Sequence, residues 1–197
     1  MKNLFKIIII SILFYSCQKA FEKLPVIDND GYVNVLIEIP SGTLEKWELN
    51  KDSGIIERDY KNGKPRTINY LGYPANYGMI PNTLSNEELG GDGDPLDILV
   101  LGSPINKGEL VKVKVIGMIE MLDNGQKDDK FIAVKKNDLI FSKINKVQEI
   151  KENFPGLLKI LKLWFENYKG INQIQVTNIY EKSIANEILL NSIISEN

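Results

Sequence analysis

Histidine is absent from this chain of 197 residues, and cysteine occurs once, as Cys17. The lack of histidine excludes Ser-His-Asp and Cys-His nucleophilic sites, and also zinc or iron sites with histidine ligands. The single cysteine excludes an intrachain disulfide and metal sites built from several cysteines. Any chemistry of this chain is therefore expected to use carboxylates, lysine, arginine or tyrosine.

An excess of positive charge is also missing. The chain has 24 Lys and Arg against 26 Asp and Glu, which gives a formal net charge of −2 and a pI near 5.4. Proteins that bind nucleic acid through its phosphates need a basic surface. We therefore predict no nucleic-acid partner. The length suits one domain with a sizeable core.

The one long apolar run lies near the N-terminus. It covers residues 7–15, is interrupted only by Ser11 and follows a basic leader. The run is too short to span a bilayer and has the form of a signal peptide. Ser16-Cys17 at its end resembles a bacterial lipoprotein signal, which implies cleavage before Cys17 and lipidation of its sulfur. An ordinary secretory signal is the alternative.

These features predict a signal peptide over residues 1–16, a lipidated N-terminus and polar tether over residues 17–30, and a folded domain over residues 31–197. The expected location is the cell envelope, facing the periplasm, with the lipid anchor as the only membrane contact. A secreted periplasmic protein is the alternative.

Strand patterns dominate the first two thirds of the domain. Alternating or β-branched segments predict strands at residues 32–40, 46–50, 55–60, 98–101, 110–119 and 131–134, and a short strand within 171–179. Helical spacing predicts helices after Pro155 and over residues 183–194, and residues 73–81 suggest a rigid loop. We predict an α+β fold, mainly β: an OB-like five-stranded closed barrel with extra hairpins and two C-terminal helices packed outside.

Three carboxylates precede the strand at residues 98–101. Asp92, Asp94 and Asp97 occupy six positions. Carboxylates this close are stable only if they are solvated, protonated or bound to a cation. Oxygen ligands favour Mg²⁺, Mn²⁺ or Ca²⁺. A divalent metal site is one interpretation, and a solvated acidic loop is the other, since Glu87 and Glu88 lie just upstream.

Residues 92–98, Asp-Gly-Asp-Pro-Leu-Asp-Ile, resemble the signature of the family I soluble inorganic pyrophosphatases. The resemblance extends from about residue 32 to about residue 170 and includes the family's Tyr-Pro-x-Asn-Tyr-Gly loop at residues 73–78. The rest of the family's active-site set appears in order at Glu38, Lys46, Glu48, Arg66, Asp123, Asp128, Lys130, Tyr168 and Lys169.

The resemblance implies Mg²⁺-dependent hydrolysis of pyrophosphate to two orthophosphates, with several Mg²⁺ ions per site and Mn²⁺ as a substitute. It assigns Asp92, Asp97, Asp123 and Asp128 as metal ligands, and we expect Asp94 to be the general base. The expected substrate ligands are Lys46, Arg66, Tyr77, Lys130, Tyr168 and Lys169. Glu38, Glu48 and Tyr73 are expected to support them, and Arg58 is a second candidate for the role of Arg66.

Two other functions stay open: a non-catalytic binding module, and a phosphohydrolase that acts on short polyphosphates or nucleotides. The resemblance also implies a homo-oligomer. A hexamer, as in bacterial relatives, is favoured, and a dimer, as in eukaryotic ones, is the alternative.

Overall fold

The structure is a computed structural model that describes residues 24–194. Its strands are β1 (Val33–Ile39), β2 (Trp47–Asn50), β3 (Ile55–Arg58), β4 (Tyr60–Lys61), β5 (Lys64–Pro65), β6 (Asn76–Met79), β7 (Asp97–Leu101), β8 (Leu110–Asp123), β9 (Gln126–Lys127), β10 (Lys130–Lys135) and β11 (Ile174–Glu181). Its helices are the 3₁₀ helix η2 (Glu87–Leu89) and the α-helices α2 (Val147–Asn153), α3 (Leu157–Tyr168) and α4 (Lys182–Asn191).

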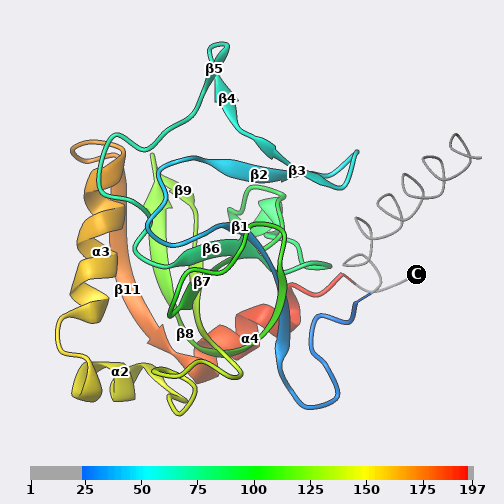
Figure 1. Cartoon of the computed structure of the whole chain (residues 1–197), viewed down its shortest axis with the longest axis vertical. Coiled ribbons are helices and arrows are strands. Elements are labelled where there is room, and N and C mark those ends of the chain that lie inside the picture. Colours follow the sequence, from blue (N-terminus) through cyan, green and yellow to red (C-terminus); the bar gives the residue numbers. More distant parts are fainter. Residues whose placement is uncertain (1–23, 195–197) are drawn as a thin grey trace, which may run out of the picture.

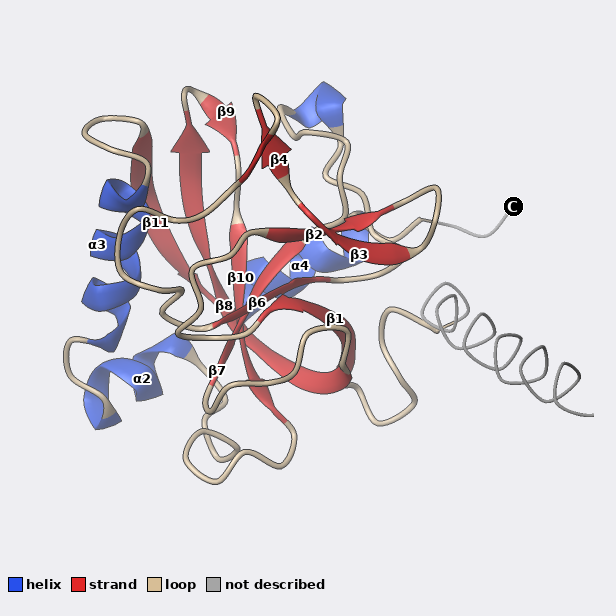
Figure 2. Ribbon diagram, turned by 45° about the horizontal axis from the view of Figure 1, so that its top comes forward, coloured by secondary structure: helices blue, strands red, loops and turns tan. Residues whose placement is uncertain are grey.

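The main sheet curves strongly around β8 (Figures 1 and 2). Its strand order is β1-β6-β7-β10-β8-β11, and β1 pairs with β8 as well, so the pairings run in a ring through β1, β6, β7, β10 and β8. Only the β7 and β10 pairing is parallel among the pairs of this sheet in the described residues. The mainly-β prediction is confirmed, and the regular closed barrel stays a prediction.

Helices and small hairpins surround this sheet. Helix α3 runs beside β11, and α4 packs against β8 (Figure 1). Strands β2 and β3 form one separate hairpin, and β4 and β5 form another that projects at the top of Figure 1. The β2–β3 hairpin contributes Glu48 and Leu49 to the pocket described below.

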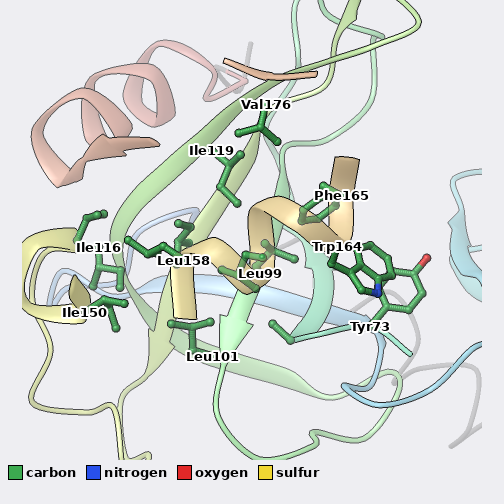
Figure 3. Close-up of a cluster of buried hydrophobic side chains, with 14 of the residues drawn as sticks. Tyr73, Leu99, Leu101, Ile116, Ile119, Ile150, Leu158, Trp164, Phe165 and Val176 are labelled. Carbon is green, nitrogen blue, oxygen red and sulfur yellow. The ribbon is translucent and has the colours of Figure 1, made fainter. Parts of the chain in front are cut away.

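Strand β7 shows how the sequence divides the core in two. Leu99 and Leu101 join the apolar cluster under α2 and α3, whereas Ile98 and Val100 join the cluster under α4. Figure 3 shows part of the first cluster, to which Leu99, Leu101, Trp164 and Phe165 all belong. Because side chains alternate along a strand, Asp97 at the start of β7 shares the face of Leu99 and Leu101. That face leads to α3.

Helix α2 and strand β6 are among the elements that the sequence did not predict. Helix α2 buries Val147 and Ile150, but seven residues are too few to show a clear helical period in the sequence. The predicted loop at residues 73–81 contains strand β6, which pairs with β1 and β7. A Cβ at Gly78 would lie 2.2 Å from the carbonyl oxygen of Leu36, so only glycine allows β1 to approach so closely there.

Residues 24–30, the described part of the predicted tether, contact the sheet. Val26 is buried, Ile27 forms a bridge with Val33, and Asn34 Nδ2 donates to the Pro25 carbonyl at 2.7 Å. The buried Val26 side chain and the contacts of its neighbours Pro25 and Ile27 hold this segment on the sheet. The predicted signal peptide and Cys17 lie outside the described residues. Within residues 24–194 no helix combines the length and hydropathy that a bilayer span requires.

Candidate active site

A single pocket of about 330 Å³ gathers every site residue predicted for the folded domain. These residues come from β1, β2, β6, β7, β8, β10, the end of α3 and the connecting loops. They are Glu38, Lys46, Glu48, Arg66, Tyr73, Tyr77, Asp92, Asp94, Asp97, Asp123, Asp128, Lys130, Tyr168 and Lys169. Residues far apart in the sequence therefore meet around one space.

The parallel strands β7 and β10 place Asp97 and Lys130 opposite each other. Lys130 is buried, its Nζ lies 2.6 Å from Asp97 Oδ2, and it also pairs with Asp128. Burial alone would lower the pKa of Lys130, but the two carboxylates outweigh it and raise that pKa. Lys130 is therefore a charged lysine held between two predicted metal ligands.

Tyr77 approaches Asp97 from β6. Its hydroxyl donates a hydrogen bond to the Asp97 carboxylate. Burial raises the pKa of Tyr77, and the charge of Asp97 raises it further. Burial also raises the pKa of Asp97, although Lys130 acts in the opposite direction. Tyr77 is therefore a neutral hydroxyl donor at physiological pH.

The loop before β7 turns sharply and displays its carboxylates at the pocket rim. Gly93 has φ +75°, and the Asp94 backbone N–H donates to Asp92 Oδ1 at 3.0 Å. Lys51, in the β2–β3 turn, donates to the Gly93 carbonyl at 3.3 Å and pairs with Asp94. Lys51 lines the pocket but was not predicted, since no local pattern distinguishes it from other turn lysines.

Asp59 lies behind two of the predicted phosphate ligands. Its Oδ2 is 3.3 Å from Lys46 Nζ and 2.5 Å from Arg66 Nη1. Arg58, by contrast, pairs with Glu45 at 2.7 Å, and among the described residues it is Arg66 that lines the pocket. The structure therefore brings Arg66, and not Arg58, to the pocket. Asp59, which the sequence did not single out, orients both cations.

The C-terminal end of α3 supplies Tyr168 and Lys169. The Tyr168 ring stacks on Trp164 with centroids 4.4 Å apart, and Trp164 Nε1 donates to the Leu71 carbonyl at 2.8 Å. The rings of Trp164 and Tyr73 also pack together, with centroids 5.0 Å apart (Figure 3). These contacts hold Tyr168 against the pocket, and burial raises its pKa, so its hydroxyl stays protonated. Lys169 pairs with Asp123 on β8.

Glu38 is the most enclosed carboxylate of the pocket. Only 6% of the residue is exposed, and the Leu49 backbone N–H donates to its Oε1 at 2.8 Å. Burial, aided by the charge of Asp97, raises the pKa of Glu38 to about 8. Glu38 therefore links β1 to β2 and holds a proton through neutral pH.

The donor set of the pocket fits hard divalent cations. Seven carboxylates line it: Glu38, Glu48, Asp92, Asp94, Asp97, Asp123 and Asp128. Five cationic side chains face them: Lys46, Lys51, Arg66, Lys130 and Lys169. Among residues 24–194 no three acidic side chains are grouped closely enough to hold a metal ion. Lysine amines pair with Asp97, Asp128 and Asp123 instead. An acidic excess of oxygen ligands is what Mg²⁺ or Mn²⁺ prefers.

Comparison with known proteins gives a consistent result. The family model described as inorganic pyrophosphatase matches residues 35–196. The mitochondrial inorganic pyrophosphatase of Saccharomyces cerevisiae is 38% identical over 160 residues, covering 72% of this chain and 52% of its own length. The inorganic pyrophosphatase of Drosophila melanogaster is 36% identical over 150 residues, covering 69% of this chain and 44% of its own length. The chain thus spans about half the length of these curated relatives.

Solved structures show the same architecture. The inorganic pyrophosphatase of Schistosoma japonicum matches with a TM-score of 0.82 at 30% identity, over 88% of this chain and 69% of that one. The enzyme from Helicobacter pylori matches with a TM-score of 0.74 at 33% identity, over 87% of this chain and 97% of that one. Because the family model matches most of this chain, the chain belongs to the inorganic pyrophosphatase family.

Proposed function

We propose that this protein hydrolyses inorganic pyrophosphate to two orthophosphates with the help of divalent cations. One observation carries the proposal: carboxylates that suit metal ions and cations that suit phosphate line the same pocket. The names of the relatives, inorganic pyrophosphatases, point to the same substrate.

The cationic and hydroxyl side chains bind the substrate in this proposal. Charge-assisted hydrogen bonds to phosphate oxygens come from Lys46, Arg66, Lys130 and Lys169. Such hydrogen bonds are about twice as strong as neutral ones. The neutral hydroxyls of Tyr77 and Tyr168 add donors without adding negative charge. These fixed donors stabilise the charge that develops on the leaving phosphate.

Asp92, Asp97, Asp123 and Asp128 are the residues that would hold the cations, for which we propose Mg²⁺, several per site, with Mn²⁺ as a substitute. Bound divalent cations neutralise phosphate charge and lower the pKa of water. Each of the four carboxylates lines the pocket, and Asp97, Asp123 and Asp128 pair with lysines that a bound polyanion could attract instead.

Asp94 is the proposed general base. It stands at the rim, where its half-exposed side chain can reach a water molecule. The water oxygen bonds to one phosphorus, the bond from that phosphorus to the bridging oxygen breaks, and Asp94 accepts the water proton. Glu38, Glu48 and Tyr73 support the ligands from behind.

A phosphate-release assay tests the proposal. Pyrophosphate, tripolyphosphate and ATP are compared with Mg²⁺ and with EDTA. We expect release from pyrophosphate with Mg²⁺ and none with EDTA. The Asp52→Asn variant, altered in the exposed β2–β3 turn, serves as a matched control and should keep full activity. Binding of pyrophosphate without release would identify a binding module instead, and preferred release from ATP would identify a nucleotide phosphohydrolase.

We further propose, from the sequence alone, that the chain is lipidated at Cys17 and faces the periplasm. Radiolabelled palmitate should enter the wild-type protein and not the Cys17→Ala variant, and membrane fractionation should show loss of the anchor. A protein that stays with the membrane after Cys17→Ala contradicts lipid anchoring.

The proposed assembly is a homo-oligomer, with a hexamer favoured over a dimer. Light scattering of the domain after removal of residues 1–23 separates these states by mass. A monomer at assay concentrations contradicts both.

A further inference from the structure

A second hollow, of about 490 Å³, adjoins the substrate pocket. It lies between the β4–β5 hairpin and the end of α3, and it shares Arg66, Tyr168 and Lys169 with the substrate pocket. An elongated ligand could therefore pass from one space to the other without leaving the protein surface. We call this hollow the basic annex.

The charge of the basic annex is opposite to that of the substrate pocket. Its cationic residues are Lys61, Arg66 and Lys169, and the part of the chain that the structure describes contributes no carboxylate to its lining. Thr67, Asn69 and Asn167 add polar groups. A concave surface of one sign focuses its field and attracts ions of the other sign. Without acidic ligands, the annex suits an anion bound directly rather than through a metal.

Lys61 is the distinctive group of the annex. Arg66 is paired with Asp59, and Lys169 is paired with Asp123. Within residues 24–194, Lys61 has no ion-pair partner. Its charge is therefore available to a ligand that extends out of the substrate pocket.

The lining also indicates which class of anion fits. Tyr168 is its one aromatic residue among those described, and that ring already stacks on Trp164. A nucleobase would have no free aromatic ring on which to stack, whereas phosphoryl oxygens need only cations and polar donors. The chemistry favours an inorganic polyphosphate chain over a nucleotide.

We propose that the basic annex binds the third phosphoryl group of a linear inorganic polyphosphate whose first two groups occupy the substrate pocket. This inference rests on the proposed function, because it places pyrophosphate in that pocket. For tripolyphosphate, the water oxygen bonds to the terminal phosphorus, the bond from that phosphorus to its bridging oxygen breaks, and the bridging oxygen leaves with the pyrophosphate product. The water proton passes to Asp94, as with pyrophosphate.

Lys61→Met tests the annex, with Lys64→Met as the matched control. Both lysines are exposed on the same hairpin and face each other across it, but only Lys61 lines the annex. We expect Lys61→Met to raise the ratio of the tripolyphosphate KM to the pyrophosphate KM by about three- to fivefold, as suits an exposed charge. Lys61→Glu should raise it by about tenfold, because it replaces attraction by repulsion, and Lys64→Met should leave it unchanged.

Several results would overturn the proposal. Equal effects of Lys61→Met and Lys64→Met would show general attraction by the hairpin, and a matching effect on ATP would remove the preference for inorganic chains. Calorimetric titration of tripolyphosphate in EDTA provides a readout without turnover, where Lys61→Met should weaken binding and Lys64→Met should not. If wild-type protein releases no phosphate from pyrophosphate, the proposed function fails, while this titration still decides for or against the annex.

Discussion

The Nζ of Lys130 lies 2.6 Å from Oδ2 of Asp97, across the parallel register of β10 and β7. One residue was predicted as a phosphate ligand and the other as a metal ligand, and in this structure they neutralise each other. The pair keeps a buried lysine charged and restrains a carboxylate that also accepts a hydrogen bond from Tyr77. The pair therefore joins β7 to β10 in the wall of the pocket.

Replacing Lys130 by methionine should destabilise the metal-free protein. Breaking a buried ion pair by removing one partner costs about 3–5 kcal/mol, because the remaining charge is left without compensation. Urea denaturation in EDTA measures the free energy of unfolding. Lys162→Met, which removes a partly exposed pair with Glu166 on α3, should cost less than about 1 kcal/mol. Equal losses in the two variants would contradict the role of Lys130.

Asp97→Asn and Asp94→Asn should fail in different ways. We expect Asp97→Asn to abolish activity chiefly through lost metal affinity. Asp94→Asn should keep most metal binding and lower turnover by about 10²- to 10⁴-fold, the usual contribution of a general base. Calorimetric Mg²⁺ titration and phosphate release, measured on both variants, separate the two effects. Full turnover of Asp94→Asn at saturating Mg²⁺ would show that another group is the base.

Asp59→Asn should impair substrate binding more than turnover. Asp59 accepts from Arg66 Nη1 and lies 3.3 Å from Lys46 Nζ, so the neutral amide would leave both cations less well oriented. We expect the pyrophosphate KM to rise by about tenfold, the value of one charge-assisted hydrogen bond, with kcat changed much less. An unchanged KM would mean that Asp59 is not needed to orient Lys46 and Arg66.

Glu38 should make the free energy of unfolding depend on pH. Its pKa is raised from 4.5 to about 8 in the folded protein, so the folded state holds a proton that the unfolded state releases. This contribution to stability is fully present below pH 4.5 and is lost as pH rises through about 8. Between these limits it amounts to a few kcal/mol, on the order of 1.4 kcal/mol per pH unit.

The Glu38→Gln variant isolates that effect. Glutamine keeps an acceptor for the Leu49 N–H but cannot ionise. The free energy of unfolding should therefore fall less in the variant than in the wild type between about pH 5 and about pH 8. Chemical denaturation in EDTA at several pH values measures the difference. Parallel pH profiles of the two proteins would show that Glu38 is not protonated in the fold.

Sequence reasoning worked best where the relevant pattern is local. The alternation of β8 and the β-branched run of β1 are visible within single segments, and both strands were predicted within a few residues. It failed where the outcome depends on contacts from elsewhere. Strand β6 lies in a segment that contains two tyrosines and two prolines, which predicts a loop. It is a strand because β1 and β7 pair with it on either side.

The candidate site follows the same division. The sequence by itself determined which carboxylates, lysines and tyrosines are candidates for the site, because the Asp92 to Asp97 signature and the order of the remaining residues can be read from the chain alone. Only the tertiary structure decided that Arg66 rather than Arg58 lines the pocket, and that Asp59 lies behind it. Those choices depend on the register of hairpins and on side-chain distances between strands far apart in the chain, which no local periodicity encodes.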